Sequence, residues 1–297
     1  MLDYKLLEAL AAVADEGGFE RAARRLNLTQ SAVSQRIRQL EDALGQPVLS
    51  RGKPPRPTEH GRALIAHARR VALLEAELNA GSAAPGAASW RTLPLAVNAD
   101  SLATWFTAAV LPALRRERVT LDLKVADQEL TFGLLRAGEV AGCVATRQTP
   151  MQGCRARFLG VMRYHCLAAP DFAREFFPHG LTMDTVGCAP AVVFNRDDTV
   201  HDRFLERALG RSPRQAPRHH VPDSERFVDF VLGGAGYGLV PHLQAEAHLR
   251  AGRLVDLAPG NPLLVPLSWH CWAVPSALLA AVEAALAEAA GRVLLAA

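Results

Sequence analysis

The chain has 297 residues, of which 49% are hydrophobic and 21% charged, and its net charge is only +3. This composition excludes a disordered chain and leaves room for two or three globular domains. The five cysteines are widely spaced, and no charged segment followed by an apolar run opens the sequence. We therefore expect no secretory signal, reduced and buried thiols, and a cytoplasmic location.

Three short helices are predicted at the N-terminus. Asp3 can cap the first helix, whose apolar face repeats at helical spacing, and Gly17-Gly18 ends it. A second apolar face runs from Phe19 to Leu26. A third apolar face runs from Val33 to Leu44. Thr29, just before this helix, can cap it, and Gly45 can end it. The second and third helices together form a helix-turn-helix.

The open side of the third helix carries short hydrogen-bonding groups at its N-terminal end. A recognition helix uses such groups to read base edges in the major groove, and the candidates are Gln30, Ser31, Ser34 and Gln35. The alternative is an ordinary amphipathic hairpin with a solvated polar face. The distribution of charge favours the DNA-binding interpretation, because the window from Arg21 to Arg70 has eleven basic and three acidic residues, whereas the rest of the chain is net acidic.

A short strand and a basic, proline-rich loop follow, from Gln46 to Pro57. This arrangement is typical of the wing of a winged helix, in which prolines hold the loop in one shape. The predicted phosphate contacts are Arg38, Arg51, Lys53 and Arg56.

A long helix, roughly Glu59 to Leu78, is predicted next, with Thr58 as its cap. Its apolar seam suits pairing with a second helix, although burial against the chain's own domain is the alternative; the seam consists of Leu64, His67, Val71, Leu74 and Leu78. Because helix-turn-helix proteins usually read two half-sites, dimerisation is the favoured interpretation. The segment from Asn79 to Ser89 has the composition of a hinge.

From Thr92 the pattern alternates between strands and helices, which indicates parallel βαβ units arranged as two lobes with a cleft between them. The predicted strands are Leu93–Val97, Val119–Val125, Ala141–Ala145, Tyr164–Ala168, Ala191–Phe194, Tyr237–Val240 and Trp269–Val274. The predicted helices are Ser101–Arg116, Leu130–Ala137, Asp202–Leu209, Glu225–Leu232 and Gln244–Ala251. The tail from Ala277 to Ala297 is predicted to be an amphipathic helix rather than a membrane span.

Polar residues gather where three of these strands end: Asn98, Asp100, Ser101 and Thr104 after the first, Asp127 and Gln128 after the second, and Asp197 and Asp198 after the strand Ala191–Phe194. A helix that begins at the carboxyl end of a strand offers free N–H groups to a carboxylate, and nearby acids would attract a cation. The alternative is that these residues only cap helices or lie in solvated loops.

Other chemistry finds no support in the sequence. The glycine-rich segment Gly233–Gly238 follows a helix and precedes a strand, the reverse of a dinucleotide-binding loop. We find no spacing typical of a metal site and no catalytic set, so we expect no metal, no cofactor and no enzymatic activity.

The N-terminal motifs resemble the winged helix of the LysR-type transcriptional regulators. The matching residues are Ala22-Ala23, Leu26, Thr29–Ser34, Ile37, Leu40-Glu41, Leu44-Gly45, Arg51, Thr58 and Gly61. The resemblance implies an α/β protein with a winged helix-turn-helix at 1–58, a linker helix and hinge at 59–89, and a periplasmic-binding-protein-like effector domain at 90–297. Lobe boundaries near 90–163 with 275–297, and 164–274, are expected. The implied partners are operator DNA, further copies of the chain as a dimer or tetramer, and RNA polymerase.

Within this family, Phe19–Ala23, Pro54–Thr58 and Leu95–Trp105 are similar to the group that senses lysine and arginine and controls a basic-amino-acid exporter. The resemblance implies an effector pocket that contains Asn98, Asp100, Ser101, Thr104, Asp127, Gln128, Asp197 and Asp198. Two alternatives remain open: a regulator that senses another small carboxylate or anion, and a solute-binding module without gene control.

Overall fold

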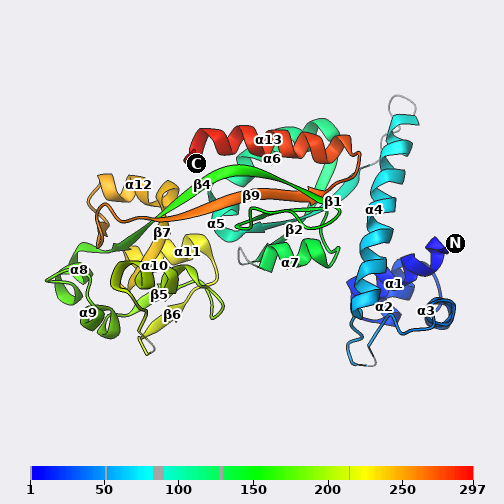
Figure 1. The fold of residues 1–297 in the computed structure, drawn as a ribbon, viewed down its shortest axis with the longest axis horizontal. Coiled ribbons are helices and arrows are strands. Elements are labelled where there is room, and N and C mark those ends of the chain that lie inside the picture. Colours follow the sequence, from blue (N-terminus) through cyan, green and yellow to red (C-terminus); the bar gives the residue numbers. More distant parts are fainter. Residues whose placement is uncertain (1, 51, 83–89, 127–129, 214, 297) are drawn as a thin grey trace.

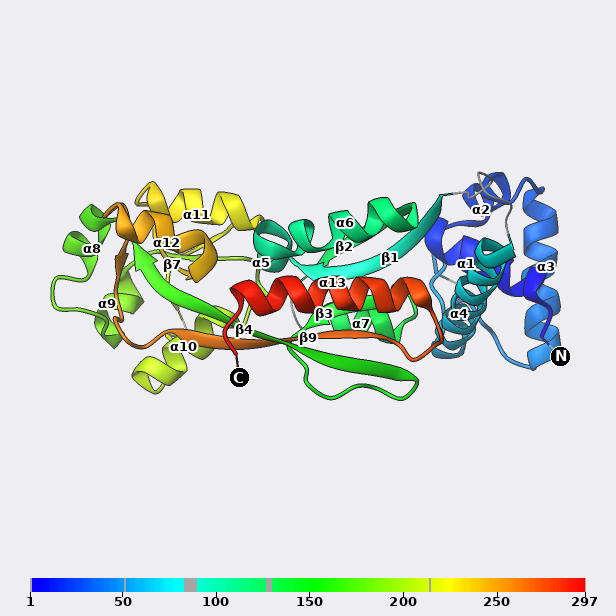
Figure 2. The same ribbon diagram turned by 90° about the horizontal axis from the view of Figure 1, so that it is seen from above.

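The computed structural model describes residues 2–50, 52–82, 90–126, 130–213 and 215–296. The molecule is elongated, with the DNA-binding domain at one end and the effector domain forming the rest (Figures 1 and 2). The long helix α4 (Glu59–Ser82) stands between the two domains (Figure 1).

The N-terminal helices form as the capping residues predict. They are α1 (Tyr4–Glu16), α2 (Phe19–Arg25) and α3 (Gln30–Leu44). Asp3 accepts a hydrogen bond from the Lys5 amide, and Thr29 accepts one from the Ala32 amide, so each satisfies an N–H group at a helix start. Gly17 and Gly45 end their helices in the left-handed conformation.

The wing is held against α3 and α4 by a few polar contacts. Leu49 and Pro57 form an antiparallel bridge, and the Glu41 carboxylate on α3 accepts from the Val48 amide at 2.8 Å. The Thr58 hydroxyl donates to the Pro47 carbonyl at 3.0 Å and accepts from the Gly61 amide at 3.0 Å, so it caps the first turn of α4 as predicted.

In the described residues the strands of the effector domain form one nine-stranded sheet, in the order β2-β1-β3-β9-β4-β7-β5-β6, with β8 paired to β4. The strands are β1 (Arg91–Asn98), β2 (Val119–Ala126), β3 (Gly142–Ala145), β4 (Cys154–Ala168), β5 (Ala191–Val193), β6 (Arg218–His220), β7 (Tyr237–Pro241), β8 (Val255–Asp256) and β9 (Leu263–Trp272). Parallel pairs join β1 with β2 and β3, and β5 with β6 and β7. These are the predicted βαβ units.

The helices divide the effector domain into two lobes. We call lobe I the part built on β1, β2 and β3, with the helices α5 (Ala99–Ser101), α6 (Thr107–Glu117), α7 (Leu130–Arg136) and α13 (Ala277–Val293). Lobe II is built on β5, β6 and β7, with α8 (Pro170–Phe176), α9 (Met183–Cys188), α10 (Val200–Leu209), α11 (Ser224–Leu232) and α12 (His242–Arg250). The antiparallel strands β4 and β9 run through both lobes and join them (Figure 1).

Several elements differ from the sequence prediction. Strand β4 begins at Cys154 rather than Tyr164, β9 runs from Leu263 to Trp272 rather than from Trp269 to Val274, and α4 continues to Ser82, into the segment predicted as a hinge. Two local features differ as well. The helix expected from Ser101 to Arg116 is interrupted by a π-helical turn, η1 (Leu102–Phe106), directly after α5. Cys188 is exposed and Cys154 is half-buried, whereas the other three cysteines are buried, so the expectation of uniformly buried thiols is wrong at these two positions.

Candidate DNA interface and interlobe cavity

The apolar face of α3 packs into the N-terminal core, which leaves the opposite face open. Val33, Ile37 and Leu40 are buried. Gln30, Ser31 and Gln35 are exposed and Ser34 is half-buried, so the four predicted base-reading side chains share the open side of one helix. Arg38 is exposed one turn further along.

The wing presents cations next to this helix. Lys53 and Arg56 are exposed, and the Arg56 backbone pairs with Ser50 across the wing, from the Ser50 amide to the Arg56 carbonyl at 2.7 Å. Arg51 lies outside the described residues. The domain therefore offers a helix with hydrogen-bonding groups and an adjacent basic loop, an arrangement suited to duplex DNA.

A cavity of about 50 Å³ lies between the two lobes. Residues at the carboxyl ends of β1 and β5, on β4 and β7, and at the starts of α10 and α11 line it; they are Asn98, Ala99, Asp100, Tyr164, Val192, Phe194, Asp198, Val200, His201, Ser224, Phe227, Leu239 and Pro241. The carboxyl ends of parallel strands from each lobe therefore meet at this cavity, as expected for open α/β sheets.

Asp100 joins the two lobes at this cavity. It lies in lobe I, where the chain turns from β1 into α5. Its carboxylate accepts a hydrogen bond from the Tyr164 hydroxyl on β4 at 2.7 Å, and a second from the Ser224 hydroxyl at the start of α11 in lobe II at 2.6 Å. One side chain of lobe I thus bonds to the crossover strand and to lobe II.

The second carboxylate in the lining, Asp198, is bonded to its own loop. One of its oxygens accepts from the Phe194 amide at 3.1 Å and the other from the Val200 amide at 2.8 Å. Asp198 therefore closes the turn between β5 and α10, as an Asx turn does. The backbone N–H groups bonded to Asp198 cannot rotate away from it, whereas the hydroxyls of Tyr164 and Ser224, which donate to Asp100, can rotate.

At the end of β1 and in α5, the buried side chains of Asn98 and Ser101 have no hydrogen-bond partner in the described part of the chain. Asn98 is 2% exposed, and both its amide oxygen and its amide nitrogen are unpaired. The Ser101 hydroxyl is likewise buried and unpaired. Because buried polar groups are nearly always paired, an unpaired amide in the cavity wall is a group that a ligand or an ordered water would satisfy.

His201 lies in the cavity wall as a neutral group. Burial lowers the pKa of His201 to about 4, and the nearby Arg218 guanidinium acts in the same direction. Among the described residues that line the cavity there is no lysine or arginine, and the ionised side chains are the carboxylates Asp100 and Asp198. The described lining thus contains two carboxylates and no cation, and Arg218 lies behind it, near His201 and Asp198.

The structure brings some of the predicted effector residues together and leaves others aside. Asn98, Asp100 and Asp198 line one cavity. Thr104 does not line it and instead donates to the Asp100 carbonyl at 2.6 Å, and Asp197 is exposed. Asp127 and Gln128 lie outside the described residues.

The sequence argument missed Tyr164, His201 and Ser224. Tyr164 was predicted to lie in a strand, but the sequence does not show which side of that strand faces the other lobe, so its role at the cavity was not predicted. Ser224 begins a helix after a short strand, so the strand-end rule that selected Asp100 would also have selected Ser224 if β6 had been recognised.

In the described part of the chain, no helix is both long and apolar enough to cross a membrane. No group of three or more His, Cys, Asp or Glu side chains among these residues is arranged to hold a metal ion.

Comparisons with known proteins agree with the predicted identity of both domains. Residues 4–62 match the bacterial regulatory helix-turn-helix family of LysR type, and residues 91–293 match the LysR substrate-binding domain. The transcriptional regulator ArgP of Pseudomonas aeruginosa strain PAO1 is 49% identical over 294 residues, which is 98% of this chain and 97% of the relative.

Two solved structures share the whole architecture. ArgP from Mycobacterium tuberculosis superposes with a TM-score of 0.88 at 37% identity, covering 100% of both chains. LysG from Corynebacterium glutamicum, solved with the effector arginine bound, superposes with a TM-score of 0.80 at 32% identity, covering 99% of this chain and 100% of that one. With a helix-turn-helix at one end and a two-lobed domain around a cleft, this chain belongs to the LysR family of DNA-binding transcriptional regulators.

Proposed function

We propose that this regulator senses a basic amino acid, arginine or lysine, in the cavity between its lobes. The observation that carries the proposal is the pair of carboxylates, Asp100 and Asp198, in a described lining that includes no lysine or arginine. A ligand with a net positive side chain would neutralise this wall, whereas an anionic ligand would be repelled by it. The arginine bound to the related LysG agrees with this choice of ligand.

Asp100 is the group best suited to bind the ligand's side-chain cation. The donors to its carboxylate include the hydroxyls of Tyr164 and Ser224, which can rotate and either donate or accept. An ionised carboxylate can accept about four hydrogen bonds, so a guanidinium or ammonium group could bind without displacing both hydroxyls. Asp198 contributes negative charge to the same cavity but keeps its loop bonds.

The ligand's α-carboxylate would bind at the helix starts on the lobe II side. Helices α10 and α11 both begin at the cavity, at Val200 and Ser224. Helix N-termini carry a partial positive charge that stabilises an anion. At these two helices the Val200 and Arg226 amides already donate to Asp198 and Asp223, so the ligand would use the remaining N–H groups of the first turns. The unpaired Asn98 amide of lobe I would supply a further donor and acceptor.

The size of the cavity indicates that binding requires the lobes to separate. A cavity of about 50 Å³ holds a few water molecules rather than an amino acid. We therefore expect opening about β4 and β9, followed by closure over the ligand, and the ligand shifts the equilibrium only as far as its affinities for the two states differ.

DNA recognition would divide between the helix and the wing. Gln30, Ser31, Ser34 and Gln35 would read base edges, and Arg38, Arg51, Lys53 and Arg56 would contact phosphates.

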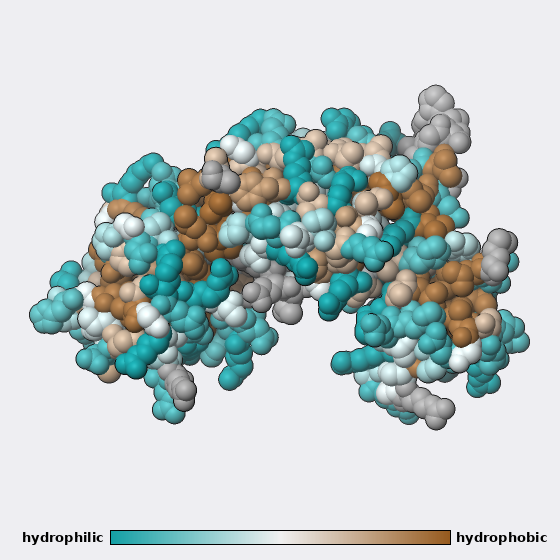
Figure 3. All heavy atoms as spheres, viewed as in Figure 1, coloured by the Kyte–Doolittle hydropathy of each residue, from teal (hydrophilic) through white to brown (hydrophobic). Residues whose placement is uncertain are grey.

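The exposed apolar side of α4 would pair with a second subunit. Leu78 is 73% exposed, and hydrophobic atoms lie on the side of α4 that faces away from lobe I (Figure 3). Assembly into a dimer or tetramer, contact with RNA polymerase, a cytoplasmic location and control of a basic-amino-acid exporter gene complete the proposal.

Calorimetry on the full chain tests the choice of effector. Arginine, lysine, citrulline and glutamate should be titrated under identical conditions, because citrulline keeps the shape of arginine but carries a neutral urea group. We expect arginine or lysine to bind at least about ten-fold more tightly than citrulline, since the ion pair is lost in citrulline. Equal binding of arginine and citrulline, or preference for glutamate, would instead support the alternative regulator of another small carboxylate.

A further inference from the structure

One face of α4 is bound to lobe I of its own chain. The residues on this face recur at helical intervals and are Ala66, Arg69, Arg70, Leu73 and Glu77. Leu73 packs against the core of the effector domain. The helix therefore contacts lobe I over about three turns rather than standing free between the domains.

Glu77 completes the cap at the start of α13. The first turn of α13 contains no acidic residue, and Ser276 satisfies only the Leu279 amide, at 3.1 Å. The Glu77 carboxylate accepts from the Ala277 amide at 3.1 Å, from the Leu278 amide at 3.3 Å and from the Ser276 hydroxyl. These are N–H groups that a helix start leaves unpaired, and a carboxylate is also favoured there by the helix dipole.

Two further contacts fix α4 along lobe I. The Arg70 guanidinium lies 5.6 Å from the ring centroid of the buried Trp272 at the end of β9, which is a cation–π distance. Gly138 approaches α4 so closely that a Cβ added to it would lie 2.3 Å from the Ala66 Cβ. Gly138 also has a φ of +70°, so both its conformation and its position favour glycine.

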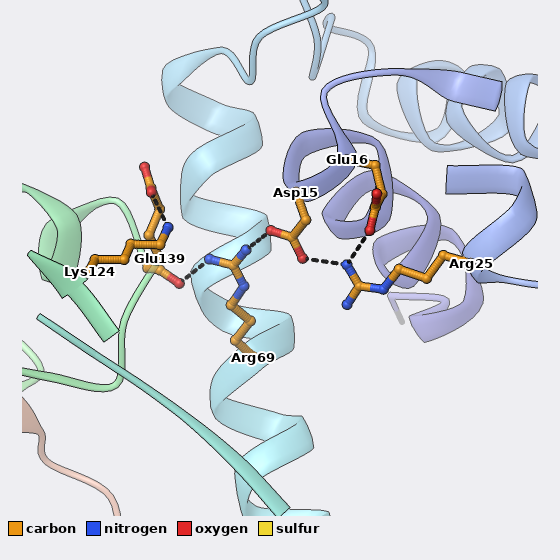
Figure 4. A network of polar contacts seen from close by, with 7 residues as sticks. Asp15, Glu16, Arg25, Arg69, Lys124 and Glu139 are labelled. Atoms are coloured by element: carbon orange, nitrogen blue, oxygen red, sulfur yellow. Dashed lines mark hydrogen bonds and ion pairs between the residues drawn. The ribbon is translucent and has the colours of Figure 1, made fainter. Parts of the chain in front are cut away.

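Arg69 connects this docked helix to the DNA-binding domain (Figure 4). Its guanidinium donates to the Gly138 carbonyl in lobe I and to the Asp15 carboxylate on α1. Asp15 in turn pairs with Arg25 at the end of α2, at 2.9 Å, and Arg25 lies 3.5 Å from Glu16. The chain of contacts runs from lobe I through α4 to the first two helices of the DNA-binding domain.

We propose that α4 is an intramolecular strap, which fixes the DNA-binding domain to lobe I of the same chain and is latched by Glu77 at the start of α13. Of the predicted seam, Leu64 is buried in the N-terminal core and His67 bonds to Tyr4 on α1. Val71, Leu74 and Leu78 lie on a different face from the strap contacts and are half-buried or exposed, so this part of the seam does not take part in docking. Release of the latch would free the DNA-binding domain to change its position relative to lobe I.

Pulsed EPR distances within the full chain test the strap without DNA or effector, so its failure is distinguishable from failure of the effector proposal. Spin labels are attached through Glu20→Cys and Arg116→Cys, whose native side chains are 77% and 70% exposed, in a Cys188→Ser background. Labelled chain is mixed with excess unlabelled chain so that distances between subunits are not detected. Glu77→Ala and Glu77→Gln are compared with Glu75→Ala, an exposed position on the same helix.

We expect both Glu77 variants to broaden the distance distribution and move its mean to longer distance, with Glu77→Ala the larger, and Glu75→Ala to match the parent. Hydrogen exchange of the Ala277 and Leu278 amides should be about ten-fold faster in Glu77→Ala. Fast exchange with unchanged distances would mean that Glu77 only caps α13, and unchanged exchange would mean that the latch is absent; either result overturns the strap.

Discussion

Replacing Asp100 by Asn tests the assignment of the cation-binding group. The two side chains have the same shape, and Tyr164 and Ser224 can each rotate to donate to or accept from an amide, so the lobes remain bonded. What the variant loses is the charge. A hydrogen bond to a charged group contributes about 1.5 to 3 kcal/mol, which at about 1.4 kcal/mol per factor of ten corresponds to a roughly 10- to 150-fold loss of arginine affinity.

The decisive quantity is the ratio of arginine affinity to citrulline affinity, measured by calorimetry on the parent chain and the variant. Asp100→Asn should bring this ratio close to one, because citrulline never makes the ion pair. Asp171→Asn is the matched control, since its carboxylate is 91% exposed on α8 and should leave the ratio unchanged. If Asp100→Asn weakens both ligands equally and preserves the ratio, Asp100 closes the cleft but does not bind the cation.

Three further predictions concern other residues of the two sites. Ser34→Ala should lower the preference for operator over random DNA in binding titrations, whereas Arg38→Ala should weaken both alike and reduce the salt slope by about one unit. Asp198→Ala should lower the free energy of unfolding in urea by about 1 to 3 kcal/mol, because two backbone N–H groups lose their acceptor. The pKa of His201 falls from 6.5 to about 4 on folding. As pH is lowered from about 6.5 to 4, the histidine is therefore protonated in the unfolded chain before it is in the folded chain, and the free energy of unfolding decreases. His201→Gln should remove roughly 3 kcal/mol of that pH dependence in urea titrations, and an unchanged pH profile would contradict it.

The N-terminal domain could be predicted closely because its determinants are local. Asp3 and Thr29 are caps that act within three residues, and Gly17 and Gly45 end their helices by their own conformation. The apolar period of each helix then specifies which face is buried. No long-range information was needed to place the open face of α3.

The crossover strands were predicted poorly because their determinants are not local. The first half of β4 alternates arginines with other residues, and it extends because β9 pairs with it from Cys154 to Tyr164. Strand β9 contains Pro266, and because proline has no backbone N–H to donate, it argues against a strand interior. In the structure Pro266 nevertheless pairs with Val161 on β4, in the middle of the ladder. The strand predicted from Trp269 to Val274 in fact runs from Leu263 to Trp272.

The same limitation applies to the interlobe cavity. A polar residue at the end of a strand can be recognised from sequence, and Asn98, Asp100 and Asp198 were found in this way. The hydroxyl that reaches Asp100 from Ser224 is 124 residues away in the chain, and only the closure of one lobe on the other brings the two together. The π-helical turn after Asp100 likewise has no signal in the apolar period.

The strap and the cavity together limit how a ligand could affect DNA binding. Strand β1 begins at Arg91 beside α4 and ends at Asn98 in the cavity wall, and it is hydrogen-bonded to β2 and β3 on its two sides, so lobe I connects the strap to the cavity as one unit. While α4 is docked, the DNA-binding domain belongs to that unit. Closure of the lobes then moves lobe II, not the helix-turn-helix, relative to lobe I. A ligand signal could therefore reach DNA by two routes: release of the Glu77 latch, or a change in the contacts that lobe II makes with a neighbouring subunit. The Glu77 variants separate these routes, because only the first depends on the latch.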